Sequence, residues 1–136
     1  ELLDTVKGIE VFDDFAHHPT AIDTTLEGAR KRLGERKLWA IIEPRSNTMR
    51  MGSHKDGLAH SARLADEVIW YQPEGLDWDL QPVIAAAPNK AVVARTLDDI
   101  IHTIVSDAGE GDAVVIMSNG GFGGLHQKLI SALNAE

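Results

Sequence analysis

The chain has 136 residues, of which 43% are hydrophobic and 25% charged, and it carries a formal net charge of −8 and no cysteine. This length and composition predict one globular domain, and the acidic balance argues against nucleic acid or an anionic membrane as a partner. The lack of cysteine excludes disulfide and thiolate chemistry and fits a reducing compartment, and no apolar run reaches the about 18–20 residues that span a bilayer.

The first third of the chain predicts two strands, a helix and a third strand. Residues 2–6 and 9–15 are expected to form strands that pair antiparallel across a tight turn. From Pro19 the apolar residues recur at helical spacing, which predicts a helix that begins there and ends at Gly34. The continuous apolar run 38–42 is typical of a strand buried on both faces of a parallel sheet.

The rest of the chain continues this alternation. The polar loop 43–53 leads into a predicted helix with Leu58, Ala62 and Ala65 on one side. Further on, the patterns predict strands at 68–71, 91–94 and 113–117, helices at 80–86 and 97–108, and a final helix carrying Leu125, Leu129 and Leu133. Trp39, Trp70 and Trp78 are expected to fill the core or an interface.

Strand–helix alternation of this kind predicts an α/β fold. We expect a three-layer sandwich with a mostly parallel, Rossmann-like sheet of about six strands and one antiparallel edge strand. Ligands of such sheets bind outside the carboxyl ends of the strands. Three polar loops follow predicted strands, with the sequences DDFAHHP, EPRSNTMRMGS and SNGGFGG. They are therefore expected to meet at one edge of the sheet.

The first of these loops brings Asp13 and Asp14 close to His17 and His18. A metal site needs three or four ligands that converge, whereas adjacent histidines on a turn point in different directions. The other histidines show no HxH or HExxH spacing, so we predict no metal site. Two interpretations stay open, a ligand contact and a helix cap formed by Asp14 or His18 with His17 in solvent.

The other two loops carry groups that suit an anion. Arg45 and Arg50 can hold carboxylates or phosphates with bidentate geometry, although a solvated surface loop is an equal alternative. The four glycines of SNGGFGG allow close approach of a ligand to the backbone before a helix N-terminus, yet the loop is neither a Walker A loop nor a GxGxxG motif. The residues alone thus predict an anion-binding edge without an activated nucleophile or a complete acid–base pair.

Together the three loops resemble the C-terminal domain of the Mur ligase family, which forms amide bonds with ATP in building the peptide of bacterial cell-wall precursors. The family's D-x-x-H-x-P-like segment is here Asp14-Phe15-Ala16-His17-His18-Pro19, and the resemblance covers essentially the whole chain. EPRSNTMRMG and SNGGFGGLHQKL are most similar to the branch that joins L-alanyl-γ-D-glutamyl-meso-diaminopimelate to UDP-N-acetylmuramate in peptidoglycan recycling. The branch that adds L-alanine is the alternative.

The resemblance implies a cytoplasmic enzyme of three domains, of which residues 1–136 are the last. A first domain would hold the UDP-sugar, and a central domain would carry the P-loop and hold most of the ATP and Mg²⁺. The chain has no P-loop and begins ELLDTV without an initiator Met, which favours a fragment that is inactive alone. Two hypotheses from other classes compete, a stand-alone nucleotide- or sugar-phosphate-binding module and a small metal-dependent hydrolase centred on Asp14, His17 and His18.

The resemblance also implies roles for individual residues. Asp14 matches the aspartate that approaches the nucleotide ribose, and His17 matches the catalytic-site histidine beside the phosphates, with a positioning role. The tripeptide site is expected to comprise His18, Arg45, Ser46, Arg50, Ser118, Asn119, Gly120, Gly121 and Phe122. The DNPR-type loop with which a related ligase reads diaminopimelate is absent from the sequence.

Overall fold

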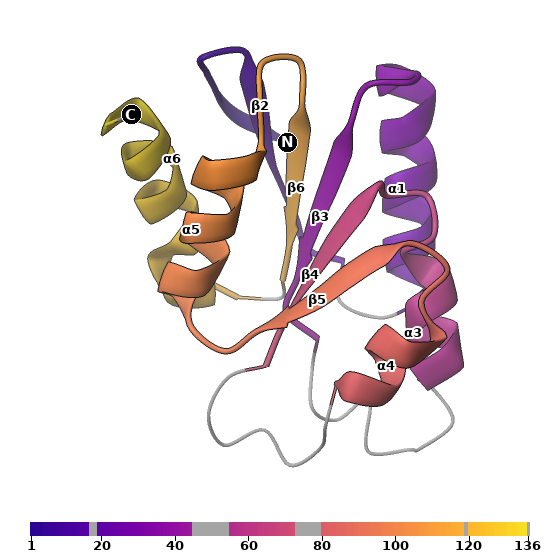
Figure 1. Cartoon of the computed structure of the whole chain (residues 1–136). Helices are drawn as coiled ribbons and strands as arrows, with labels where there is room; N and C mark the ends of the chain where they lie inside the picture. Colours follow the sequence, from indigo (N-terminus) through magenta and orange to yellow (C-terminus); the bar gives the residue numbers. More distant parts are fainter. Residues whose placement is uncertain (17–18, 45–54, 73–79, 119, 136) are drawn as a thin grey trace.

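A six-stranded sheet forms the middle layer of the computed structural model, which describes residues 1–16, 19–44, 55–72, 80–118 and 120–135 (Figure 1). Its strands lie in the order β1-β2-β6-β3-β4-β5, and only the β1–β2 pair at the edge is antiparallel. This arrangement confirms the predicted fold class. The strands are β1 (Leu2–Val6), β2 (Ile9–Asp14), β3 (Leu38–Ile42), β4 (Glu67–Tyr71), β5 (Lys90–Ala94) and β6 (Ala113–Met117).

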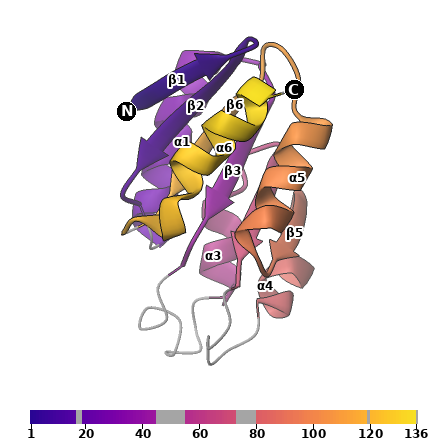
Figure 2. The ribbon, with the colours of Figure 1, turned by 90° about the vertical axis from the view of Figure 1, so that its left-hand side faces the viewer.

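Helices cover both faces of the sheet, as the two views in Figures 1 and 2 show. One face carries α1 (Pro19–Leu33), α3 (Lys55–Ser61) and α4 (Gln81–Ala86), and the other carries α5 (Leu97–Asp107) and α6 (Leu125–Ala135), which a short 3-10 turn (Phe122–Gly124) precedes. Among the described helices, none is long and apolar enough to cross a membrane.

The central strands explain why the sheet is buried on both sides. All five residues of β3 and all five of β6 are buried, because side chains alternate between two faces that are both covered by helices. Trp39 and Trp70 belong to the two opposite cores, as expected for core tryptophans. The Trp39 indole N–H donates to Asp112 Oδ2 at 3.0 Å, which satisfies its one polar atom. Trp78 lies outside the described residues.

Two predicted elements end earlier in the structure. Strand β2 stops at Asp14, and Phe15 is 72% exposed beyond it. The helix predicted through Ala65 ends at Ser61, whose hydroxyl donates to the Leu58 carbonyl at 2.6 Å. Ala62 and Ala65 are still buried, but they lie in turns after the helix. The predicted helix was too long because buried apolar residues recur at helical spacing beyond the point where the helix ends.

Arg30, near the end of α1, joins three segments at the amino-terminal ends of β3 and β4. Its guanidinium donates to the carbonyls of Gly34 and Arg36 at 2.9 Å each and twice to the carbonyl of Leu64, at 3.2 and 2.7 Å. The fifth N–H donates to Asp66 Oδ2 at 3.0 Å. All five donors of the fork are thus used, and one side chain ties α1 to the segments that lead into β3 and β4.

Glu67 is a buried carboxylate between two lysines. Lys90 Nζ lies 3.1 Å from Oε1, and Lys37 Nζ pairs with Oε2. Burial raises the pKa of Glu67, but hydrogen bonds from Lys37 and Lys90 and their positive charges outweigh it, so the pKa lies below its usual 4.5. A depressed pKa in the folded state means that Glu67 stabilises the fold above this usual value and loses that contribution as the pH falls through the folded pKa.

We therefore expect Glu67→Gln to reduce the acid sensitivity of the fold. Between about pH 7 and about pH 3.5, the melting temperature of the variant should fall less than that of the wild type, because one stabilising charge no longer titrates. Glu27→Gln is the matched control, since its pair with Lys31 is exposed and long at 3.7 Å and such pairs contribute little. Equal acid slopes for the wild type and Glu67→Gln would contradict the expectation.

Candidate functional site

The carboxyl ends of three neighbouring strands lie in register. Met117 at the end of β6 pairs with Asp14 at the end of β2 and with Ile42 at the end of β3. Backbone bonds extend this pairing by one residue on each side, from Ser118 N to Asp14 O at 3.1 Å and from Glu43 N to Met117 O at 2.9 Å. The prediction that the three polar loops start side by side is confirmed.

Asp13 and Asp14 point to opposite faces of the sheet, as successive strand residues do. On one face, Asp14 Oδ1 accepts hydrogen bonds from the Ala16 amide at 2.8 Å and from the Thr25 hydroxyl at 3.2 Å, in the middle of α1. On the other face, Asp13 Oδ1 lies 2.8 Å from His126 Nε2, in the first turn of α6. These bonds of Asp14 go to its own loop and to mid-helix, so they are not the N-cap bonds of α1.

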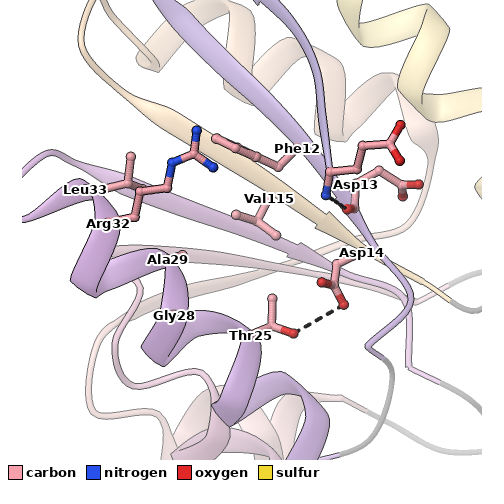
Figure 3. A pocket seen from close by; sticks show the side chains of 10 residues that line it. Phe12, Asp13, Asp14, Thr25, Gly28, Ala29, Arg32, Leu33 and Val115 are labelled. Carbon is pink, nitrogen blue, oxygen red and sulfur yellow. Dashed lines mark hydrogen bonds between the residues drawn. The ribbon is translucent and has the colours of Figure 1, made fainter.

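A hollow of about 220 Å³ lies beside Asp14, between β2 and α1 (Figure 3). Its lining is mainly apolar, with Phe12, Ala29, Leu33 and Val115 among the lining residues. The Arg32 guanidinium lies over the Phe12 ring at 5.3 Å from its centroid. Figure 3 shows the Asp14 carboxylate turned toward Thr25, with Arg32 farther along the helix.

The glycine-rich turn after β6 is shaped by its own side chains. Ser118 is buried, and its hydroxyl donates to the Gly120 carbonyl at 2.8 Å and accepts from the Gly120 amide at 3.3 Å. Phe122 has a φ of 51° and is only 4% exposed, because its ring packs into the core against Tyr71 at a centroid distance of 5.1 Å. The Ser118 and Phe122 side chains are therefore engaged within the fold, so a ligand at these two residues would meet chiefly the backbone.

The four glycines of this turn differ in what they require. Gly123 and Gly124 have φ values of +58° and +78°, a conformation that favours glycine. Gly120 and Gly121 have no such φ, and a Cβ added to either would meet nothing within 4 Å. Neither backbone conformation nor packing thus requires glycine at these two positions, and both face open space.

Tyr71 adds a polar group at the end of β4. Burial raises the pKa of its hydroxyl above the usual 10.0, and the negative charge of nearby Glu43 raises it further. Tyr71 is therefore protonated at neutral pH and is a hydrogen-bond donor at the same edge of the sheet. The sequence offered no motif that singled it out.

Several predicted site residues lie outside the described residues, namely His17, His18, Arg45, Ser46, Arg50 and Asn119. Those described are Asp14, Ser118, Gly120, Gly121 and Phe122, and the structure brings them to one edge. The sequence interpretation missed Thr25 and His126, the partners of the two aspartates, although their positions on one helical face and at a helix start are weak signals. In the described part of the chain, no group of three or more His, Asp or Glu side chains could hold a metal ion.

The fold is that of an α/β domain with a mostly parallel sheet, and comparison with known proteins identifies its family. Residues 1–120 match the family model described as "Mur ligase, glutamate ligase domain". The chain belongs to the Mur ligase family. It is 46% identical, over 134 residues, to the UDP-N-acetylmuramate–L-alanyl-γ-D-glutamyl-meso-2,6-diaminoheptandioate ligase of Escherichia coli, covering 98% of this chain and 29% of that protein.

Two further relatives define how far the similarity extends. The crystal structure of a murein peptide ligase from Psychrobacter arcticus superposes with a TM-score of 0.92 at 56% identity, over 100% of this chain and 30% of that one. The UDP-N-acetylmuramate–L-alanine ligase of Leuconostoc citreum is 33% identical over 90 residues, which are 66% of this chain and 20% of that protein. The chain thus spans less than a third of the length of these relatives.

Proposed function

We propose that the chain is the C-terminal domain of an ATP-dependent ligase that joins L-alanyl-γ-D-glutamyl-meso-diaminopimelate to UDP-N-acetylmuramate in peptidoglycan recycling. The observation that carries this proposal is the extent of the similarity. Likeness to the Escherichia coli tripeptide ligase covers 98% of the chain, whereas likeness to the Leuconostoc citreum L-alanine ligase covers 66%. An L-alanine-adding enzyme is therefore the second candidate.

In the proposed reaction, the carboxylate of UDP-N-acetylmuramate takes the γ-phosphoryl group of ATP and forms an acyl phosphate with release of ADP. The amine of the tripeptide then attacks the acyl carbon, the amine loses a proton, and phosphate leaves. Such a reaction depends on positioning its reactants and stabilising their negative charge, so a domain that supplies donors without a nucleophile suits it. Because the substrates are ATP and a UDP-linked sugar, we place the enzyme in the cytoplasm.

The edge of the sheet is proposed to serve two of the substrates. Asp14 would accept from the ribose hydroxyls of ATP, and His17 would position the phosphates and the reacting carboxylate. Arg45 and Arg50, with Ser46 and His18, are proposed to hold carboxylates of the tripeptide. The turn from Ser118 to Phe122, including Asn119, would then present its backbone to the peptide, with Gly120 and Gly121 leaving room for it.

ATP and Mg²⁺ are proposed to be held mainly by a central domain of the full-length protein. The described carboxylates of this edge do not fit a metal site of their own. Asp13 and Asp14 face opposite sides of the sheet, and each is bonded to a different helix. We therefore assign no part of the metal site to these two residues.

The proposal predicts which proteins are active. The full-length protein should release ADP and form the UDP-linked tripeptide when supplied with ATP, Mg²⁺, UDP-N-acetylmuramate and the tripeptide, and it should react poorly with L-alanine in place of the tripeptide. The isolated 136-residue chain should form no product in the same assay, because its sequence contains no P-loop. Product formed by the isolated chain, or faster ligation of L-alanine, would contradict the proposal.

A further inference from the structure

We infer that Thr25 is a positioning residue for the nucleotide, acting through the carboxylate of Asp14. This inference rests on the proposed function, in which Asp14 accepts from the ribose. Thr25 lies eleven residues along the chain, in the middle of α1, and its hydroxyl donates to Asp14 Oδ1 at 3.2 Å. Figure 3 shows the two side chains turned toward each other beside the hollow.

The bond fixes which oxygen of the carboxylate meets the ligand. Both donors from the described residues, the Ala16 amide and the Thr25 hydroxyl, reach Oδ1. Among the described residues none donates to Oδ2, and we infer that this oxygen is the one that meets the ligand hydroxyl. A carboxylate that rotates freely loses entropy when it binds, whereas one held by two donors is already oriented.

The two donors to Asp14 belong to structural elements of different kinds. The Ala16 amide lies only two residues after Asp14, in the segment that follows β2, so this bond joins the carboxylate to its own stretch of chain. Thr25 belongs to a helix of 15 residues whose Ile22, Leu26 and Leu33 are buried in the core. The bond from Thr25 thus fixes the orientation of the Asp14 carboxylate relative to a helix that is anchored in the core.

The alternative is that the bond only stabilises the fold by joining α1 to β2. Part-buried hydrogen bonds to charged groups do contribute to stability, so a loss of stability alone would not distinguish the two roles. A positioning role predicts a dependence on the ribose hydroxyls, which a structural role does not. The test therefore compares nucleotides with and without those hydroxyls.

The experiment uses the full-length protein and measures the Kd of β,γ-imido-ATP and of its 2′,3′-dideoxy form by calorimetry. Thr25→Val removes the hydroxyl at nearly constant shape and should raise the Kd of the ribose form by about tenfold, roughly the effect of one hydrogen bond to a charged group. The Kd of the dideoxy form should stay within about twofold of the wild type. Thr25→Ser should restore most of the affinity, and Thr24→Val, at the exposed neighbouring position, should change neither Kd.

The outcomes separate this inference from the proposed function. Asp14→Asn should weaken binding of the ribose form, and wild-type affinity in that variant would remove both the proposed Asp14 contact and the role of Thr25. Weak binding by Asp14→Asn with normal binding by Thr25→Val would overturn the inference alone. Equal loss of both nucleotides in Thr25→Val, with a lowered melting temperature, would likewise reduce the bond to a structural one.

Discussion

Replacing Arg30 with methionine is expected to lower the free energy of unfolding of the chain by about 3 kcal/mol and its melting temperature by roughly 10 °C. Methionine keeps much of the aliphatic stem but leaves the carbonyls of Gly34, Arg36 and Leu64 without the donors they have in the native fold. Asp66 also loses its cation. Denaturant unfolding of the purified chain, followed by circular dichroism, measures the change.

Two companion variants show whether the geometry of the fork is responsible. Lys31→Met removes a neighbouring cation whose pair with Glu27 is exposed, and it should cost less than about 0.5 kcal/mol. Arg30→Lys keeps the charge but cannot reach several carbonyls at once, so it should recover only part of the loss. If Arg30→Met and Lys31→Met destabilise the chain equally, the network around Arg30 does not hold the fold as described.

Alanine at Gly121 and at Gly123 should have opposite effects. At Gly123 the φ of +58° is costly for alanine, and the added Cβ would lie 2.9 Å from Leu97 Cδ1. We expect a loss of about 1–2 kcal/mol in the free energy of unfolding. Gly121 has a φ of −73° and open space around it, so alanine there should leave stability unchanged or raise it by about 0.5 kcal/mol.

Gly121→Ala, which should leave the stability of the fold intact, is expected to impair binding of the tripeptide. In the full-length protein, Gly121→Ala should raise the KM for the tripeptide by about tenfold, because a methyl group enters the space in which we place the peptide. The KM for ATP should not change. Steady-state kinetics with each substrate varied in turn measure both values. An unchanged KM for the tripeptide would show that the peptide does not pass close to Gly121.

Local patterns predicted the elements well, because each depends on neighbouring residues. The apolar runs 38–42 and 113–117 became β3 and β6, and the helix predicted from Pro19 to Gly34 became α1. The order of the strands could not be predicted, since β6 enters between β2 and β3 through pairings of residues far apart in the chain.

The candidate site divides in the same way. That the three loops leave the sheet at one edge followed from the general rule for parallel sheets, and the register of Asp14, Met117 and Ile42 confirmed it. The contacts that orient the side chains were missed, because Asp13 and His126 are 113 residues apart and no local motif joins them. Phe122 was expected among the residues of the tripeptide site, and its ring is buried in the core. The sequence could not predict this orientation, because nothing in a glycine-rich loop indicates which way an apolar side chain points.

The alternation of Asp13 and Asp14 has a consequence for how the proposed enzyme would assemble its reactants. Asp14 is bonded to α1 on the face of the sheet where we place the nucleotide, and Asp13 is bonded to the start of α6, directly after the glycine-rich turn. Successive strand residues are separated by about 3.3 Å along the strand. If the domain closes as one body, as we propose, the Asp14 contact to the ribose and the turn that meets the peptide would move together with a fixed offset. The tripeptide would then reach the reacting centre in the same motion that completes the nucleotide contacts.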